Sequence, residues 1–189
     1  MRKVSFAYAL LTLLAIAVVS VMAVTVAPTQ AATGCDLSAG TVWAPPKQRP
    51  LRVEAFSHGP SCDKAVVVVV VRGSDGAPLW VDSRTGSFVA LFAGITSPAE
   101  MKKTLAVWIR QDHMFRSSAN LPAWPPGADQ PVAGEFPFYV EEGLDRDGYQ
   151  AIRAARVPVF CYVQGMESMA CVVLKDGGMQ KVGVQSFPG

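Results

Sequence analysis

Residues 65–76, AVVVVVVRGSDG, decide the fold, because six consecutive valines are followed by a charge and two glycines. A membrane-spanning helix needs about 20 apolar residues, and this run offers seven including Ala65. Valine is stiff at its first side-chain torsion, so a short run bounded by turn residues predicts a strand. Because the run does not alternate with polar residues, we expect a strand in the interior of a sheet that is covered on both faces.

Further strands are predicted on both sides of the valines. The turn-forming sequence GSDG at 73–76 precedes an apolar run at 78–81, which indicates a hairpin. Residues 51–56 alternate in polarity and predict a strand before the valines. Residues 88–92 predict a fourth strand after them.

A helix over 97–112 is the strongest local prediction. Ser97 and Glu100 form a capping box around Pro98, and apolar residues then recur at helical spacing: Met101, Leu105, Trp108 and Ile109. Prolines at 122, 125, 126, 131 and 137 predict a long loop over 120–138 instead of a helix or a central strand. A shorter helix is expected near 147–155.

Three apolar runs close the chain, at 157–163, 169–174 and 179–185, and turn residues separate them. Adjacent runs with short turns pair antiparallel. The predicted class is therefore α+β, with an antiparallel sheet of about six to seven strands and two helices.

The first residues read as a secretory signal peptide. Arg2 and Lys3 precede an apolar run, and small residues then lead to a cleavage site after Ala31. Cleavage leaves a single globular domain, 32–189, with no membrane span, and predicts a periplasmic or secreted protein. An uncleaved membrane anchor and lipidation at Cys35 remain open alternatives.

The charge of the predicted mature chain argues against nucleic acid as a partner. Removing Arg2 and Lys3 from the 17 basic residues leaves 15, against 15 acidic residues. A nucleic-acid binder needs a basic excess or stripe, and this sequence has neither.

The four cysteines predict two disulfides in an exported chain. A hairpin turn centred on Met166 places Cys161 opposite Cys171, within disulfide range. Cys35 and Cys62 are then left as the second pair.

Few residues suit catalysis. Ser61 and Lys64 have the Ser-x-x-Lys spacing of penicillin-binding proteins, but Lys64 adjoins the predicted valine strand instead of lying one helical turn from the serine. His58 and His113 are the two histidines, too few for a three-histidine zinc site. A serine or histidine centre could still assemble in space.

Metal sites have competing structural explanations. Met166, Glu167 and Met169 offer soft ligands for copper, but disulfide-bonded cysteines beside them cannot ligate. Asp145 and Asp147 suggest calcium, yet their spacing fails the EF-hand pattern and suits a helix cap. We therefore predict no metal and no cofactor.

The proline-rich loop contains the best candidates for partner binding: Trp124, Phe136, Phe138 and Tyr139. Stiff backbone loses little entropy on binding, and each ring offers a large contact area. Alternatively, the same rings fold back to cover the sheet.

These observations predict a small, exported, disulfide-stabilised protein that binds a protein, peptide or glycan of the cell envelope without catalysis. The alternative is a small envelope hydrolase centred on Ser61, Lys64, His58 or His113. The sequence identifies neither the ligand nor the oligomeric state.

Overall fold

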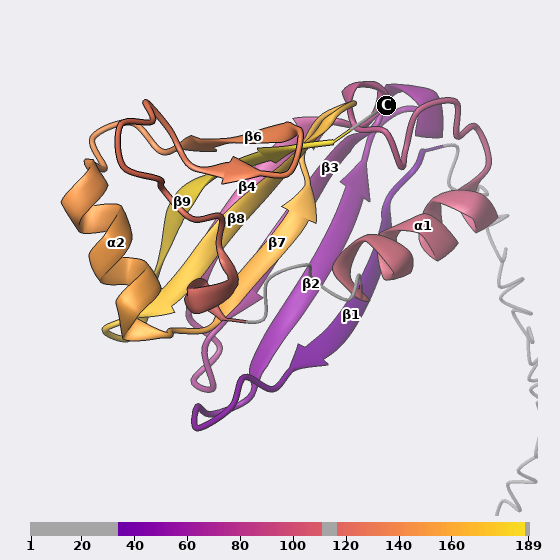
Figure 1. Cartoon of the computed structure of the whole chain (residues 1–189). Coiled ribbons are helices and arrows are strands. Elements are labelled where there is room, and N and C mark those ends of the chain that lie inside the picture. Colours follow the sequence, from indigo (N-terminus) through magenta and orange to yellow (C-terminus); the bar gives the residue numbers. More distant parts are fainter. Residues whose placement is uncertain (1–33, 111–116, 188–189) are drawn as a thin grey trace, which may run out of the picture. The chain divides into compact units, whose positions relative to one another are not determined.

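The computed structural model of the chain describes residues 34–110 and 117–187. The chain divides into two units, Met1–Gln30 and Ala31–Gly189. The predicted signal peptide, His113 and the predicted helical residues 111–112 lie outside the described residues. Within the described part, the second unit has the predicted α+β class (Figure 1).

The first half of the second unit forms sheet 1, a four-stranded antiparallel meander in the order β1-β2-β3-β4. The strands are β1 (Leu37–Trp43), β2 (Leu51–His58), β3 (Val66–Arg72) and β4 (Pro78–Thr85). The valine run is β3, an inner strand, and its predicted hairpin with β4 is confirmed. β1 was not predicted, because its small residues obscure the alternation of apolar and polar side chains that is typical of a strand.

The second half forms sheet 2, with β6 (Phe136–Val140), β7 (Val159–Val163), β8 (Ser168–Lys175) and β9 (Gly178–Ser186). Their order is β6-β9-β8-β7, and the two-residue β5 (Val132–Ala133) extends the β6 edge. The three antiparallel strands predicted at the end of the chain are confirmed.

The prediction of one sheet of six to seven strands is wrong, because the described residues form two sheets of four main strands each. Strands β7 and β8 are buried on both faces, so each face of sheet 2 must be covered. A core shared with sheet 1 and α1 covers one face, and α2 with the proline-rich segment covers the other.

Both predicted helices are present, α1 (Pro98–Arg110) and α2 (Arg146–Ala155). The Ser97 hydroxyl accepts a hydrogen bond from the Glu100 backbone N–H at 3.2 Å, as the predicted cap requires. The Asp145 carboxylate accepts one from the Gly148 N–H at 2.8 Å and so caps α2.

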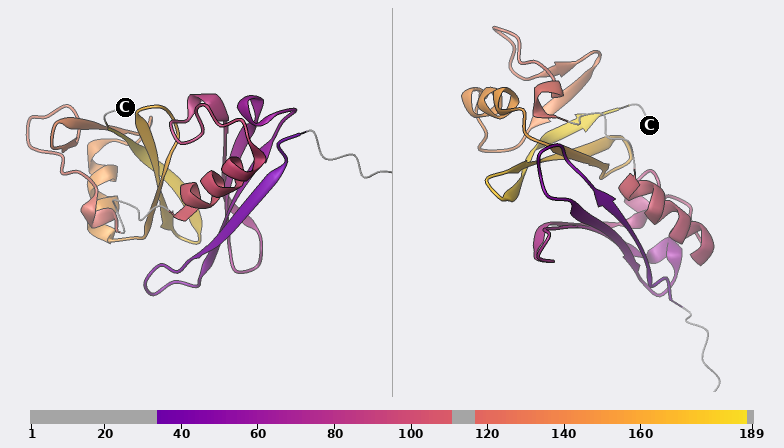
Figure 2. Two further views of the ribbon diagram at one scale, coloured as in Figure 1. Left: turned by 90° about the vertical axis from the view of Figure 1, so that its right-hand side faces the viewer. Right: turned by 90° about the horizontal axis from the view of Figure 1, so that it is seen from below.

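A first core lies between sheet 1 and sheet 2, with α1 alongside (Figure 2). Val67, Val69 and Val71 point from β3 into this core and are fully buried. The Trp108 indole of α1 donates a hydrogen bond to the Val163 carbonyl at 2.8 Å, which ties the helix to sheet 2. Trp43 of β1 also meets sheet 2, where its ring lies 5.4 Å from the ring of Phe160.

A second core covers the opposite face of sheet 2. Its buried residues come from α2, the strands of sheet 2 and the proline-rich segment, and include Tyr149, Ile152, Phe138 and Leu121. The Tyr149 hydroxyl donates to the Pro122 carbonyl at 2.8 Å. This bond fixes the proline-rich segment to α2.

Two local predictions are corrected. Residues 88–92 are not a strand: Phe88 ends the 3-10 turn Gly86–Phe88, and residues 89–92 continue as a bend and turns. The predicted loop over 120–138 ends early, because β6 begins at Phe136 and includes Pro137. One neighbour of β6 is β9, and the other is β5, which has two residues. β6 is therefore close to an edge strand, where a proline, which has no backbone N–H, is tolerated.

The predicted disulfides are both confirmed, Cys35–Cys62 and Cys161–Cys171. Cys161 and Cys171 are directly opposite in the β7–β8 register, with alpha carbons 4.1 Å apart. The first bridge joins the segment before β1 to the turn that leads into the valine strand. Among the described residues, no helix has the length and apolar character needed to cross a membrane.

Candidate functional site

The outer face of sheet 1, which points away from the first core, is the candidate functional site. Even-numbered residues of β1, β2 and β3 project from it. Its central row crosses the sheet from Gly40 through Glu54 and Val70 to Val81. On either side, Ser38 lies opposite Phe56 and Val42 lies opposite Arg52.

The expectation that the valine strand is covered on both faces is therefore wrong for sheet 1. Val66 is 41 % exposed on the outer face of β3, and Val68 is half-buried. Val42 and Val81, on the two edge strands of the same face, are 67 % and 55 % exposed. A run of valines makes both faces of a strand apolar. The first core covers the inner face, whereas of the valines on the outer face of β3 only Val70 is buried.

A charge cluster extends on this face from Glu54 to the end of the β2–β3 ladder, where Arg52 is paired with Arg72. Glu54 is buried and receives hydrogen bonds from Arg72 Nε at 2.6 Å and from Arg52 Nε at 2.8 Å. The hydrogen bond from Arg72 is the main reason why the pKa of Glu54 lies below its ordinary value, and Arg52 lowers it further against the opposing effect of burial. Two guanidinium charges against one carboxylate leave this cluster with one net positive charge.

A cleft of about 430 Å³ lies beside the charge cluster. Its lining combines five consecutive residues of β1 with three residues of β2: Ser38, Ala39, Gly40, Thr41, Val42, Arg52, Glu54 and Phe56. A Cβ added to Gly40 would have the Val53 carbonyl, at 3.9 Å, as its only neighbour within 4 Å. The missing side chain at Gly40 thus leaves an open notch in front of Glu54.

The residues considered for serine catalysis are not assembled. Ser61 precedes the 3-10 turn Cys62–Lys64, and its hydroxyl hydrogen bonds to the Asp63 carboxylate, which lowers the pKa of Asp63. No described hydrogen bond joins Ser61 to the exposed Lys64 side chain. The arrangement lacks the activating contact between the amine and the hydroxyl.

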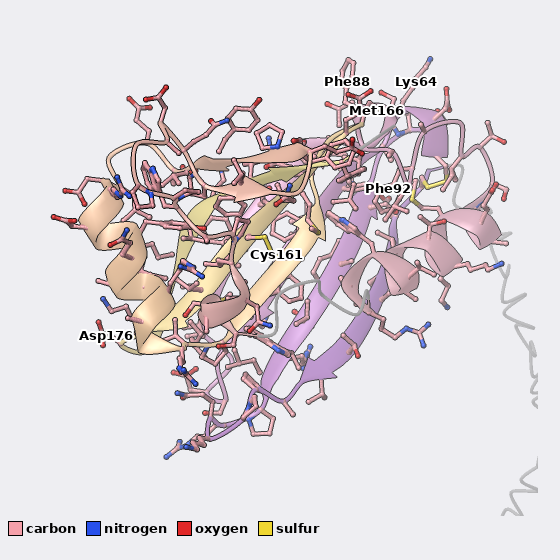
Figure 3. All side chains as sticks on the ribbon, in the orientation of Figure 1. Lys64, Phe88, Phe92, Cys161, Met166 and Asp176 are labelled. Atoms are coloured by element: carbon pink, nitrogen blue, oxygen red, sulfur yellow. A yellow bond between two sulfur atoms is a disulfide. The ribbon has the colours of Figure 1, made fainter. Side chains whose placement is uncertain are left out.

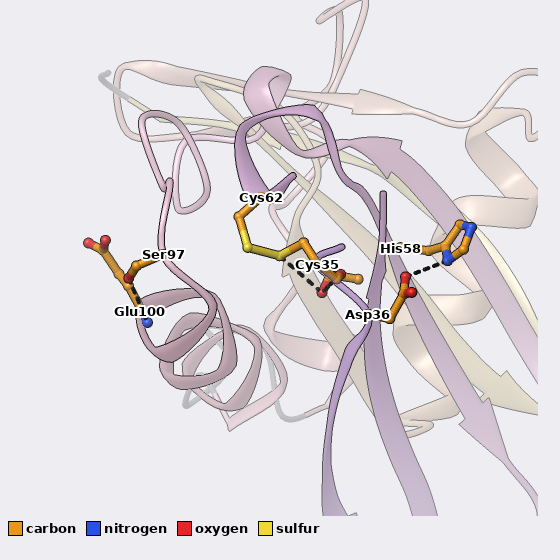
Figure 4. The surroundings of a disulfide bond; sticks show 7 residues. Cys35, Asp36, His58, Cys62, Ser97 and Glu100 are labelled. Atoms are coloured by element: carbon orange, nitrogen blue, oxygen red, sulfur yellow. Dashed lines mark hydrogen bonds and ion pairs between the residues drawn. A yellow bond between two sulfur atoms is a disulfide. The ribbon is translucent and has the colours of Figure 1, made fainter. Parts of the chain in front are cut away.

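His58 pairs with Asp36 through Nδ1 and Oδ1, 2.5 Å apart, close to the Cys35–Cys62 disulfide (Figure 4). Both side chains are exposed. Among the described residues, no serine hydroxyl hydrogen bonds to the other ring nitrogen of His58. The pair therefore lacks a nucleophile.

The aromatic residues of the proline-rich segment are divided between core and surface. Phe138 is fully buried in the second core, and its ring lies 5.8 Å from that of Tyr149. Trp124 and Phe136 are half-buried, and the Trp124 indole donates to the Ala128 carbonyl at 2.8 Å. Tyr139 is 52 % exposed. Partner binding by this segment stays a prediction. A partner could contact the Phe138 ring only if that ring left the second core.

The candidate metal ligands have other partners or stand apart. Asp145 caps α2, and Cys161 and Cys171 form a disulfide. No group of three His, Cys, Asp or Glu side chains in residues 34–110 and 117–187 is placed to hold a metal ion.

Two further exposed apolar side chains, Phe88 and Met166, were not predicted as a surface feature. Phe88 and Met166 are exposed at the same end of the structure (Figure 3). A hydrogen bond of 3.2 Å from the Ala90 N–H to the Gly165 carbonyl holds their two turns together.

The signal for the candidate site was present in the sequence but incomplete. Arg52, Glu54 and Phe56 occupy one face of the alternating strand at 51–56, and Arg72 ends the valine run. Their proximity depends on the β2–β3 register, which pairs Arg52 with Arg72. No protein-family model matches this sequence, and no curated protein or solved structure matches it either.

Proposed function

We propose that this chain is an exported, non-catalytic binding protein that holds its partner on the outer face of sheet 1. The observation that carries the proposal is the exposure of Val42 and Val81 beside a hydrogen-bonded charge cluster, with Val66 exposed farther along the same face. Exposed apolar surface bordered by polar groups is typical of interaction sites. Charged groups beside such a surface add specificity.

The rigidity of the sheet supports this function. Sheet 1 packs on sheet 2 through the buried valines of β3, and the Cys35–Cys62 disulfide ties the segment before β1 to the β2–β3 connection within sheet 1. A surface built on paired strands loses little conformational entropy when it binds. The hydrolase alternative has less support, because the described Ser61 and His58 lack the contacts that activate a nucleophile, while His113 lies outside the described residues.

The proposed location is the cell envelope or the exterior. Disulfides form and persist in oxidising compartments, and all four cysteines are bridged. The order of basic, apolar and small residues in 1–31 agrees with export.

Site-specific photo-crosslinking in the expressing cell tests the proposal. A benzophenone side chain replaces Val81 or Val42 in separate variants, and Val107 of α1, 44 % exposed, is the matched control. We expect a discrete crosslinked species from the two sheet positions and none from Val107. Equal crosslinking at all three positions, or none at the sheet, would contradict the proposal.

A further inference from the structure

The outer edge of β1 carries unpaired backbone groups. β1 pairs with β2 alone in the described residues. The Cys35 N–H donates to the Gly59 carbonyl at 2.8 Å, in line with the β1–β2 register, so odd-numbered residues direct their backbone groups to β2. In an antiparallel pair the alternate residues point outward. Ser38, Gly40 and Val42 therefore present N–H and C=O groups to the outer edge.

The sequence of this edge lacks the features that usually protect edge strands, and Ser38, Gly40 and Val42 stay exposed although α1 packs against β1. The sequence of β1, LSAGTVW, contains no proline and no charged residue, and its register with β2 runs without a bulge over seven pairs. Natural edge strands are commonly blocked by lysine, proline or a bulge. An open edge of this length can accept another strand.

The cleft follows this edge. All five residues from Ser38 to Val42 line it, and Arg52, Glu54 and Phe56 form its side toward the centre of the sheet. An added strand repeats its side-chain positions every second residue. One such side chain would lie over the notch at Gly40, beside the charge cluster.

The charges favour an acidic group at that position. Glu54 already accepts hydrogen bonds from both arginines, while the Arg52 side chain remains 67 % exposed. A guanidinium has donors left for a second carboxylate, which it can bind in a bidentate manner. A basic side chain in the notch would instead meet a net positive charge.

Resting on the proposed function, we infer that the partner is an extended acidic peptide segment, which adds to β1 as a fifth strand of sheet 1. Its backbone bonds to the outer edge at Ser38, Gly40 and Val42, and an acidic side chain contacts Arg52. Main-chain bonds supply affinity in this binding mode, and side-chain pockets supply specificity. A second copy of the chain fits less well, because β1 itself carries no acidic residue to place near Arg52.

The test uses the full chain with both disulfides formed and a bead-displayed library of end-blocked octapeptides. Valine alternates with randomised positions in the library. We expect selected peptides to be enriched in Asp or Glu at the randomised positions. Two methylated versions of a selected peptide are compared, one at the odd-numbered and one at the even-numbered backbone nitrogens. The version whose methyl groups face β1 should not bind, and the other should bind as before.

Two variants locate the site. Gly40→Val fills the notch, and Val42→Pro removes an outward-pointing N–H without breaking a β1–β2 hydrogen bond. Each should weaken peptide binding by at least about tenfold. Gly178→Val is the matched control, since an added Cβ there also has a single neighbour, the Lys175 carbonyl at 3.9 Å. Unchanged melting temperatures confirm that all three variants are folded.

Several results would overturn the inference: no enrichment of acidic residues, equal binding by Gly40→Val and Gly178→Val, or undiminished binding of both methylated versions of the peptide. A dimer in sedimentation that Val42→Pro dissociates, without peptide binding, would identify a second copy as the occupant and would also overturn it. Crosslinking at Val81, which lies on the opposite edge strand, tests the broader proposal independently. Crosslinks there without peptide binding would leave the outer face as a binding surface and remove the strand-addition mode.

Discussion

Glu54 shows how a single buried carboxylate can organise an exposed face. Its two arginine partners come from its own strand and from the end of the valine run. Because each partner hydrogen bonds to the ionised form, the folded state holds the pKa of Glu54 below the ordinary value of 4.5. The cluster is therefore both a structural contact and a source of positive charge on the surface.

The pH dependence of stability tests this description. A carboxyl group whose pKa is lowered by folding stabilises the protein at any pH above the pKa that the group has in the unfolded chain. This stabilisation is lost as the pH falls through the lower pKa of the folded state. We expect Glu54→Gln to reduce the free energy of unfolding at neutral pH by about 1–3 kcal/mol. In urea titrations the wild type should also lose stability below pH 4.5 more steeply than the variant. Parallel pH profiles would contradict the role given to Glu54.

Phe138 and Tyr139 are neighbours in the chain with opposite environments. Phe138 is fully buried beside Tyr149, whereas Tyr139 is 52 % exposed. We expect Phe138→Ala to lower the free energy of unfolding by about 3–5 kcal/mol, through lost burial and a cavity. Tyr139→Ala should change it by less than about 1 kcal/mol. Urea unfolding measures both, and equal effects would show that Phe138 is not a core residue.

At the scale of elements, the two disulfides restrain different connections. Cys161–Cys171 crosses the β7–β8 hairpin with a sequence separation of 10, and Cys35–Cys62 closes a separation of 27 around β1 and β2. The longer loop loses more conformational entropy when it is closed in the unfolded chain.

Paired cysteine-to-alanine variants test this difference. On the chain-entropy model, we expect a loss of about 3.6 kcal/mol without Cys35–Cys62 and about 2.7 kcal/mol without Cys161–Cys171. Removing the first bridge should also increase hydrogen exchange at the start of β1, which the second should not affect. Exchange that rises equally in β1 for both variants would contradict a local role for the Cys35–Cys62 bridge.

At the scale of the whole described unit, Tyr162 joins the two sheets. Its hydroxyl accepts a hydrogen bond from the Trp80 indole at 3.0 Å and donates one to Asp82 at 2.8 Å, both on β4. Burial, and then the nearby Asp82 carboxylate, raise the pKa of Tyr162 well above its ordinary value of 10.0. Burial also raises the pKa of Tyr149 in the second core.

The loss of stability at alkaline pH should depend on the Tyr162 and Tyr149 hydroxyl groups. Because the pKa of each phenol is raised in the folded state, its contribution to stability is fully present below pH 10. Above pH 10 the phenol ionises in the unfolded chain first, and this contribution is lost. We expect stability to fall above this pH, and Tyr162→Phe and Tyr149→Phe each to make the fall shallower. Tyr139→Phe, at a side chain that is 52 % exposed, is the matched surface variant. Three identical slopes would contradict the effect of burial.

Local sequence patterns determined most elements and both disulfides of this protein. The valine run, the Ser97 cap and the apolar runs after 157 act through backbone preferences that neighbouring residues set. The Cys161–Cys171 pairing followed from the position of one turn, because a hairpin register is a local property. Local reasoning failed at β1, where small residues weaken the alternation.

Only the tertiary structure decided which surfaces are covered. Six valines make both faces of β3 apolar, and no local rule states that the first core covers one face while the other is exposed at Val66 and buried at Val70. The same holds for Phe138 and Tyr139, whose burial depends on the position of α2. The candidate site combines residues from β1, β2 and β3, and their proximity follows from strand register over long sequence separations. Such contacts are fixed by the packing of the whole core, which no short stretch of sequence specifies.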